Sequence, residues 1–451
     1  MQAKFLLILA ALAMFLPIAV MQYIGEESYY TLSAYEIFVT GDWWHQSIFG
    51  LYWPKTPLYN WLIIAAAQVV GWEHLEIAAR FVSVAATLGS ASFVFLMAKR
   101  LFGEAEQVPF LAASIYLTMG EISFWYGWLG YADATFGFFI FAALACLWIS
   151  IEDNKLNYFI YSLLLISMAF MVKNISCYAL YGMAGFILLW RLQRWQLLKQ
   201  PLFLLSGIAA LMVPWLYQHL ALNAGSNSTI AIGDALRNFA GYSLADYLKH
   251  WISYPALFIG RAFPVTLLLI WFYWRHKQRY SMSSPLITLT WILLAWLAPF
   301  WLSAAGTPRY LVPMYGLLAL LLTGLSLQLG REQLQTVLKA MLIIIILKVP
   351  YSLGILPYIK DWRPERDLNA VAEEILQLTR DHTVRTRDDV STGLSIGAYM
   401  DVRIPPEKYI RWYDGREHQV FVLCDFLDPK LGELKKSWRL RGDDVHLYWQ
   451  P

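Results

Sequence analysis

The chain has 451 residues, of which 58% are hydrophobic, 16% aromatic and only 15% charged. This composition is too apolar for an ordinary soluble protein and indicates a protein that spans a membrane. The formal net charge of +3 is too small to suggest nucleic acid as a partner. The three cysteines, Cys146, Cys177 and Cys424, predict no disulfide framework.

Long apolar stretches recur from Phe5 to about Ile359, and Lys and Arg gather in alternate gaps between them. The positive-inside rule places these gaps in the cytoplasm. About eleven transmembrane helices are predicted, the first of them an uncleaved anchor. The predicted spans are 5–23, 81–98, 108–126, 134–151, 157–172, 175–190, 202–221, 255–273, 285–303, 310–328 and 340–358. An odd number of crossings puts the C-terminal tail on the outer side.

The first outer loop, 24–80, contains apolar residues that do not make a further span. Leu58 to Gly71 is apolar, but at roughly 14 residues it is shorter than a crossing helix needs to be. We expect an interfacial or re-entrant helix there. Ala34, Ile37 and Phe38 predict a second amphipathic surface helix, which ends near Gly41.

The composition becomes polar after Tyr358, and this change predicts two domains: a transmembrane domain, 1–358, and a soluble outer domain, 359–451. Apolar residues from Leu368 to Leu376 recur at helical spacing. Short strands are predicted at 395–399, 419–424 and 445–449. The tail is therefore expected to be a small α/β domain with its own core.

Acidic and basic residues cluster at the predicted outer ends of the spans. They are Glu26, Glu27, Lys55, Arg80, Asp133, Lys173, Arg261 and Arg309. Ionisable groups at membrane depth are costly, so such a set calls for an explanation. Carboxylates that can deprotonate a nucleophile, together with cations that hold a phosphate, suit the transfer of a sugar from a lipid phosphate. The tryptophans of the first loop suit a lipid interface.

Each of these residues also has a simpler interpretation. Glu26 and Glu27 could lie in a solvated loop, and Asp133 could cap a helix. Lys55, Lys173 and Arg309 could extend to lipid headgroups. The histidines show no recognisable metal-ligand spacing, so no metal site is assigned, although a divalent metal stays an open alternative. The chain has no Gly-rich phosphate loop and no Ser-centred nucleophile elbow.

A series of short motifs, in order and on the predicted outer side, resembles the GT-C glycosyltransferases of the dolichyl-phosphate-mannose protein mannosyltransferase and ArnT-like superfamily. The resemblance covers about the first 330 residues. The motifs are Glu26-Glu27-Ser28-Tyr29-Tyr30, Gly41-Asp42-Trp43, Trp53-Pro54-Lys55-Thr56-Pro57-Leu58-Tyr59-Asn60-Trp61-Leu62, Ala79-Arg80-Phe81-Val82-Ser83, Tyr131-Ala132-Asp133, Met171-Val172-Lys173-Asn174 and Pro308-Arg309-Tyr310-Leu311-Val312-Pro313.

This resemblance implies a GT-C fold and an inverting glycosyltransferase that takes a sugar from a polyprenyl-phosphate donor. It implies Glu26, Glu27 and Asp133 as catalytic residues. Residues expected to bind substrate are Tyr29, Lys55, Arg80, Lys173, Arg261, Arg309 and Tyr310. Glu26 stands where the family usually has Asp, and Pro54 stands where ArnT-like members have Glu. A metal site of that branch is therefore not carried over.

The implied location is a bacterial inner membrane, with the active site and the C-terminal domain in the periplasm. The acceptor stays open among a glycolipid such as lipid A, a polysaccharide and a protein. The main alternative is a transporter or flippase of polyprenyl-linked lipids, whose charges would line a path through the membrane. Because the charged residues are predicted at one surface of the bilayer and not along a path through it, they favour the enzyme over the transporter. A structural scaffold is the third alternative.

Overall fold

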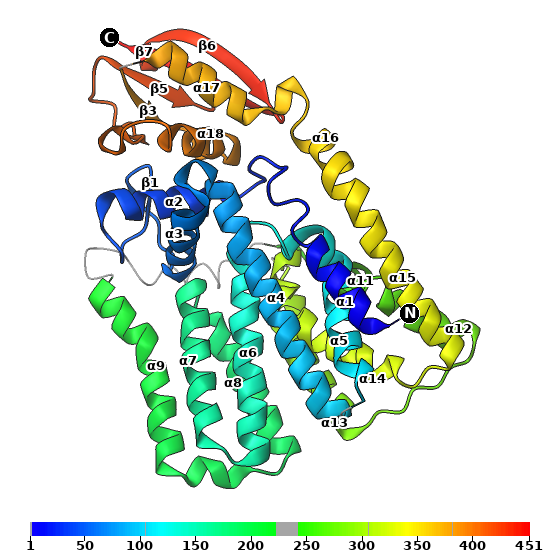
Figure 1. Ribbon diagram of the computed structural model, residues 1–451. Coiled ribbons are helices and arrows are strands. Elements are labelled where there is room, and N and C mark those ends of the chain that lie inside the picture. The colour runs from blue at the N-terminus through cyan, green and yellow to red at the C-terminus, as the bar shows by residue number, and fades with distance from the viewer. Residues whose placement is uncertain (1, 104, 222–241, 305, 381) are drawn as a thin grey trace. The chain divides into compact units, whose positions relative to one another are not determined.

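The computed structural model describes residues 2–103, 105–221, 242–304, 306–380 and 382–451 (Figure 1). Contacts within the chain divide it into two compact units. We call the first, residues 1–15, 83–128 and 132–349, the helical unit. The second, residues 16–82, 129–131 and 350–451, contains both helices and strands and is called the mixed unit.

The helical unit consists of apolar helices, several of them long. They are α1 (Ala3–Ala13), α4 (Leu75–Phe102, whose first residues belong to the mixed unit), α5 (Gln107–Thr118), α6 (Ala132–Asp153), α7 (Leu156–Val172), α8 (Ser176–Arg191), α9 (Pro201–Ala221), α11 (Leu244–Arg261), α12 (Val265–Arg275), α13 (Ser284–Leu302), α14 (Tyr315–Ser326) and α15 (Arg331–Pro350). A π-helical turn, η2 (Ile122–Tyr126), follows α5, and 3₁₀ turns η3 (Trp195–Lys199) and η4 (Pro308–Met314) precede α9 and α14.

Helix α6 is buried along most of its length because it packs against both α7 and α8. Figure 1 shows α6, α7, α8 and α9 as neighbouring rods. Phe159 of α7 stacks on Phe203 of α9 with ring centroids 3.7 Å apart. Apolar side chains therefore hold these helices together.

Six helices in the described part of the chain are long and apolar enough to cross a membrane, and the bent pair α11 and α12 would make a seventh. Four shorter apolar helices include α1, α5 and α7. The polytopic helical fold is thus confirmed. The count of about eleven crossings stays a prediction, since helix length and composition identify fewer.

Three predicted spans are not continuous helices. In 5–23, α1 ends at Ala13 and is followed by turns around Pro17, which has no N–H to continue a helix. In 108–126, α5 ends at Thr118 and η2 follows. In 255–273, α11 and α12 meet at 103°, and Pro264 lies at the break.

The mixed unit combines the first loop with the C-terminal segment. The first loop forms α2 (Glu27–Thr40), a hairpin of β1 (Ser47–Ile48) and β2 (Leu51–Tyr52), α3 (Leu58–Val70) and η1 (Trp72–His74). The C-terminal segment forms η5 (Tyr351–Ile355), α16 (Leu356–Lys360), η6 (Pro364–Arg366), α17 (Leu368–Thr379), β3 (Thr383–Thr386), α18 (Ser391–Asp401), η7 (Pro406–Lys408), β4 (Arg411–Trp412), β5 (Val420–Cys424), η8 (Pro429–Leu431), β6 (Glu433–Leu440) and β7 (Asp443–Gln450).

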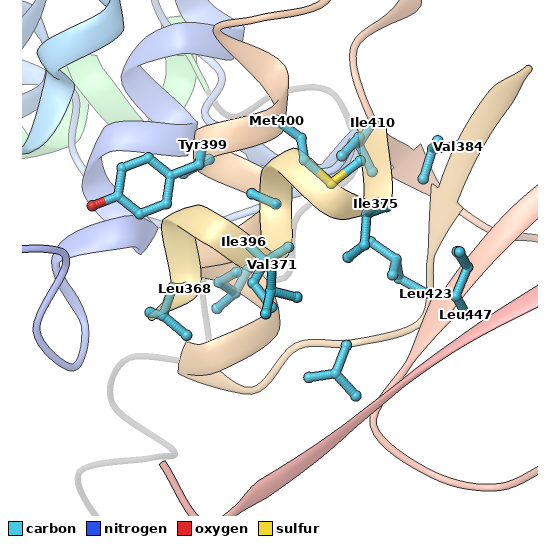
Figure 2. Packing of buried hydrophobic residues seen from close by; sticks show 14 of the residues in the cluster. Leu368, Val371, Ile375, Val384, Ile396, Tyr399, Met400, Ile410, Leu423 and Leu447 are labelled. Carbon is cyan, nitrogen blue, oxygen red and sulfur yellow. The ribbon is translucent and has the colours of Figure 1, made fainter. Parts of the chain in front are cut away.

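The larger sheet has the strand order β4-β3-β5-β7-β6. Strand β3 runs parallel to β4 and β5, whereas β7 is antiparallel to β5 and β6. Figure 2 shows residues of α17 and α18, among them Val371, Ile375 and Ile396, packed with Leu423 and Leu447 of the sheet. This arrangement confirms the predicted small α/β part of the fold.

The core of this α/β part also contains residues of the first loop. Tyr23, Leu32 and Phe49 belong to the same buried cluster as the α17 side chains. Tyr23 packs on Tyr399 of α18, with ring centroids 4.8 Å apart. The boundary at 358/359 stays a prediction, but within the mixed unit the first loop and the C-terminal segment share one core.

One prediction in this unit differs from the structure, and three others agree with it. Residues 395–399 are helical, in α18, and the predicted strand is wrong. This helix is buried all round, so its sequence shows no clear apolar stripe. Helix α2 ends at Thr40 with Gly41 in the left-handed region, as predicted. The predicted strands at 419–424 and 445–449 are confirmed as β5 and β7.

Candidate active site

The mixed unit holds one of the predicted acids, Glu27, in a fully buried ion pair with Arg80. The Glu27 carboxylate accepts from Arg80 Nε at 2.9 Å and Nη2 at 2.6 Å, and also from the backbone N–H groups of Ile24 and Gly130. The other N–H groups of Arg80 donate to backbone carbonyls, including Ile18 O at 3.0 Å. Both charges are thus fully engaged in holding the start of the first loop.

Glu26 differs from its neighbour because its side chain is half-buried and lies at the N-terminal boundary of α2. Its backbone N–H donates to the Tyr131 hydroxyl at 2.9 Å, and that hydroxyl donates to Ile24 O at 3.3 Å. Gly25, with φ +56°, lies so close to the Tyr131 hydroxyl that a β-carbon would not fit there. The turn that carries Glu26 is therefore fixed by Tyr131.

Lys55 is exposed and lies over the Trp53 ring, 5.9 Å from its centroid. The buried Gln46 side chain holds its backbone, because Gln46 Nε2 donates to Lys55 O at 2.7 Å. Trp53 also packs against Tyr29 and Tyr30, at 6.0 and 5.5 Å between ring centroids.

Tyr29 packs against Trp53 and is also influenced by the charge of Glu26. Burial raises the pKa of Tyr29, and the negative charges of Asp389 and Glu26 add to the rise. The Tyr29 hydroxyl donates to Asp389 O at 2.9 Å. The Glu26 charge thus acts on the hydroxyl of a predicted substrate-binding residue.

The helical unit pairs another predicted acid with a predicted cation. Asp133, in the first turn of α6, accepts from Lys173 Nζ through Oδ1. The Lys173 ammonium also lies 5.0 Å from the centroid of the Tyr310 ring, and the Arg309 guanidinium lies 5.7 Å from that centroid. Asp133 is 2% exposed, and its Oδ2 has no hydrogen-bond partner among the described residues.

This geometry argues against the simpler interpretations of Asp133 and Lys173. Asp133 is the second residue of α6, and among the described residues its carboxylate is hydrogen-bonded to Lys173, so helix capping does not explain it. The Lys173 side chain is only 16% exposed, so it does not extend to lipid headgroups. A buried carboxylate oxygen without a partner is costly and marks a place where a proton or a ligand is needed.

Arg261, the last residue of α11, forms an ion pair with Glu121, which the sequence analysis missed. The Tyr126 hydroxyl lies within electrostatic range of Asp133, Glu121, Arg309 and Arg261. The helical unit therefore gathers two acids with Lys173, Arg261 and Arg309. A single acid inside the apolar run 108–126 was the signal that could have pointed to Glu121.

The predicted site residues thus form two groups. Glu26, Glu27, Tyr29, Lys55 and Arg80 lie in the mixed unit, and Asp133, Lys173, Arg261, Arg309 and Tyr310 lie in the helical unit. Within the described ranges, no group of three or more His, Cys, Asp and Glu side chains is arranged to hold a metal ion.

The family model described as dolichyl-phosphate-mannose-protein mannosyltransferase matches residues 54–217. An undecaprenyl phosphate-alpha-4-amino-4-deoxy-L-arabinose arabinosyl transferase of Pseudomonas aeruginosa (strain UCBPP-PA14) is 28% identical over 315 residues, which are 66% of this chain and 55% of the relative. A second transferase of that name, from Proteus mirabilis, is 22% identical over 317 residues, covering 68% and 56%. The chain therefore spans about half the length of the curated relatives it matches.

The crystal structure of ArnT from Cupriavidus metallidurans bound to undecaprenyl phosphate superposes with a TM-score of 0.75 at 14% identity, covering 98% of this chain and 97% of that one. Its apo state gives a TM-score of 0.71 with the same coverage. The protein is thus a membrane protein with the GT-C fold. Its predicted resemblance to the dolichyl-phosphate-mannose protein mannosyltransferase and ArnT-like superfamily is confirmed.

Proposed function

We propose that the protein is an inverting glycosyltransferase that moves a sugar from a polyprenyl-phosphate donor to an acceptor at the periplasmic face of a bacterial inner membrane. The observation that carries this proposal is the charge cluster of the helical unit. In this cluster, the buried Asp133 pairs with Lys173 through one carboxylate oxygen, and its other oxygen has no hydrogen-bond partner among the described residues. The charges of Asp133, Arg261 and Arg309 all act on the Tyr126 hydroxyl. Relatives named as transferases that use undecaprenyl phosphate support the same chemistry.

The reaction breaks one bond and forms another at the anomeric carbon of the sugar. The acceptor hydroxyl or amine attacks this carbon, and the bond from the carbon to the phosphate oxygen breaks, so the lipid phosphate leaves with the electron pair. A carboxylate takes the proton of the acceptor, and cations stabilise the charge that develops on the phosphate. Attack from the face opposite the phosphate inverts the configuration.

Within the mixed unit, we assign one residue as the base and one as a cation. Glu26 is the proposed base, because Tyr131 fixes its backbone and its side chain is only half-buried. Lys55 is exposed on a loop that Gln46 holds, and we assign it to the donor phosphate. Tyr29 is assigned to substrate binding. Although Glu27 was expected to be catalytic, its buried pair with Arg80 favours a role in positioning Glu26.

Within the helical unit, we assign Asp133 as the second acid and three further residues as cations. Asp133 orients the acceptor or shares its proton, and Lys173 holds its carboxylate in place through their ion pair. Arg261 and Arg309 bind phosphate, for which the guanidinium geometry is well suited. The Tyr310 ring makes cation–π contacts with Lys173 and Arg309, and we assign it to stacking against the sugar.

The acceptor is a glycolipid such as lipid A, a polysaccharide or a protein. Comparative mass spectrometry of lipids, polysaccharide and envelope proteins, from cells with and without this chain, identifies the class that loses a sugar. Purified protein in nanodiscs should then transfer the sugar from its undecaprenyl-phosphate form to that acceptor. If the lipid-linked donor only changes leaflet and no product forms, the protein is a flippase and the transferase proposal fails.

A further inference from the structure

The ion pair between Glu121 and Arg261 is unequal in its exposure. The Glu121 side chain is 6% exposed, whereas that of Arg261 is 35% exposed. One nitrogen of the guanidinium, Nη1, donates to Glu121 Oε1. No other hydrogen bond of Arg261 is found in the described part of the chain. The buried carboxylate therefore holds one side of a guanidinium whose remaining N–H groups can bind another anion.

The backbone around this pair is held in place by a second contact. Gly120 N–H donates to Phe263 O at 2.9 Å, and Phe263 follows Arg261 in the break between α11 and α12. A β-carbon on Gly120 would lie 1.9 Å from the Phe263 ring, so only glycine allows this approach. The segment that carries Glu121 is thus fixed to the bend that carries Arg261.

Charged residues of both signs belong to the cluster that contains the pair. The charges that act on the Tyr126 hydroxyl come from Glu121, Asp133, Arg261 and Arg309, and Asp133 also pairs with Lys173. Among the described residues of this cluster, three cations therefore face two carboxylates. An excess of one positive charge suits an anionic ligand.

We propose that Glu121 is a positioning residue that holds Arg261 by Nη1 and directs its other N–H groups to the phosphate of the lipid donor. This inference rests on the proposed function and adds to it a residue that the sequence motifs do not include. Glu121 thus orients Arg261 for binding of the lipid phosphate and for catalysis.

Two variants separate this role from simple stabilisation of the fold. Glu121→Gln keeps the size of the side chain but removes the charge that orients Arg261, so undecaprenyl phosphate should bind about tenfold more weakly with an unchanged Tm. The kcat for sugar transfer should fall at least about tenfold and the donor KM should rise, because Arg261 is misdirected. Glu121→Asp keeps the charge and should recover part of kcat.

The experiment measures binding of undecaprenyl phosphate to purified protein in nanodiscs, together with kcat, KM and Tm. Arg261→Gln should bind undecaprenyl phosphate at least about tenfold more weakly. Glu152→Gln is the matched control, because Glu152 also pairs with an arginine, Arg100, at 2.8 Å, and it lies outside the cluster. This control should match wild type in every measurement.

The outcomes distinguish the inference from the proposed function. If wild type binds undecaprenyl phosphate and Glu121→Gln has the same affinity and kcat, the positioning role is wrong. Weaker binding in Glu121→Gln and Glu121→Asp, with a lower Tm in both, would show that the pair only stabilises the fold and would also overturn the inference. If wild type neither binds undecaprenyl phosphate nor transfers a sugar, the proposed function itself fails.

Discussion

Glu26 and Glu27 are neighbours in the chain but lie in opposite environments. Glu27 is buried and accepts four hydrogen bonds, two of them from Arg80. Glu26 is half-buried, and its backbone N–H donates to the Tyr131 hydroxyl. A buried, fully paired carboxylate is poorly suited to accept a proton from a substrate, whereas a partly exposed one is well suited. Replacing each separately therefore tests different properties.

Glu26→Gln should lower kcat by roughly 10²- to 10⁴-fold and leave Tm unchanged, because the amide keeps the shape but cannot act as a base. Glu27→Gln should instead destabilise the protein by about 3–5 kcal/mol, since it leaves the Arg80 charge buried without its partner. Measuring Tm and turnover of both variants with a purified lipid-linked donor separates the loss of catalysis from the loss of stability. Near-normal turnover by Glu26→Gln would make Asp133 the leading candidate for the base.

Lys55→Ala should raise the donor KM and lower kcat, because a cation beside the phosphate stabilises it before and during bond cleavage. Lys55→Arg should keep partial activity, since the charge remains but the geometry of the group changes. Lys435→Ala, at another exposed lysine, serves as the control. Wild-type kinetics for Lys55→Ala would mean that the side chain only contacts lipid headgroups.

At the scale of elements, the buried Gln46 side chain and backbone hold the Lys55 part of the segment between α2 and α3. Besides donating to Lys55 O, Gln46 accepts from Trp53 N–H at 2.8 Å through its backbone and from Asn60 Nδ2 at 3.1 Å through its side chain. The position of Lys55 therefore depends on a residue nine positions earlier in the chain.

Gln46→Ala should destabilise the protein by about 1–3 kcal/mol, because it leaves buried polar groups without partners. It should also raise the donor KM, since the Lys55 loop is no longer fixed. The exposed Gln68→Ala on α3 is the control. Thermal unfolding and donor kinetics measure the two effects, and a lower Tm with an unchanged KM would separate the Gln46 contacts from donor binding.

The turn before α18 contains a buried acid, Asp388, whose pKa is raised to about 7 by burial and by the neighbouring Asp425, Asp389 and Asp443. Its Oδ1 accepts from Val390 N–H at 3.0 Å, and its Oδ2 has no partner among the described residues. In the folded protein it therefore keeps its proton up to a pH at which the unfolded chain, with a pKa near 3.8, has lost it.

The stabilisation from protonated Asp388 is complete below pH 3.8 and is lost as the pH rises to about 7. The free energy of unfolding should fall in this window with a slope of up to about 1.4 kcal/mol per pH unit. Asp388→Asn keeps the acceptor for Val390 but cannot ionise, so it should raise Tm at pH 8 much more than at pH 5. The exposed Asp414→Asn is the control, and equal shifts at both pH values would contradict the prediction.

At the scale of the whole molecule, ion pairs within the helical unit agree with the sidedness predicted from Lys and Arg. Arg100 at the end of α4 pairs with Glu152 and Asp153 at the end of α6, and both ends are predicted to be cytoplasmic. Asp133 and Lys173, both predicted at outer ends, pair with each other. Residues assigned to one side of the membrane are thus brought together.

Reporter fusions should therefore place residues 50 and 400 outside and residue 195 inside. The physical reason is that Lys and Arg resist transfer across the membrane, so the loops rich in them stay in the cytoplasm. Fusions after each apolar helix would also count the crossings. A cytoplasmic signal from residue 400 would mean an even number of crossings and would contradict a periplasmic C-terminal domain.

The sequence by itself determined the membrane class, the helical fold and the positions of most elements, because apolar composition and spacing are local properties of the chain. Helix α17 and strands β5 and β7 were predicted in this way. The motifs around Glu26 and Lys55 also pointed to the GT-C superfamily. The predicted strand at 395–399 failed because a helix buried on all sides has no amphipathic pattern.

Only the tertiary structure decided which charges meet. The partners Glu27 and Arg80 are 53 residues apart in the chain, and Arg261 and Glu121 are 140 apart. The sequence shows each charge but not its partner, since ion pairs between distant segments depend on how the helices pack. The break between α11 and α12 and the close approach of Gly120 to Phe263 likewise arise from packing. These contacts separate a structural acid, Glu27, from Glu26, and they identify Glu121.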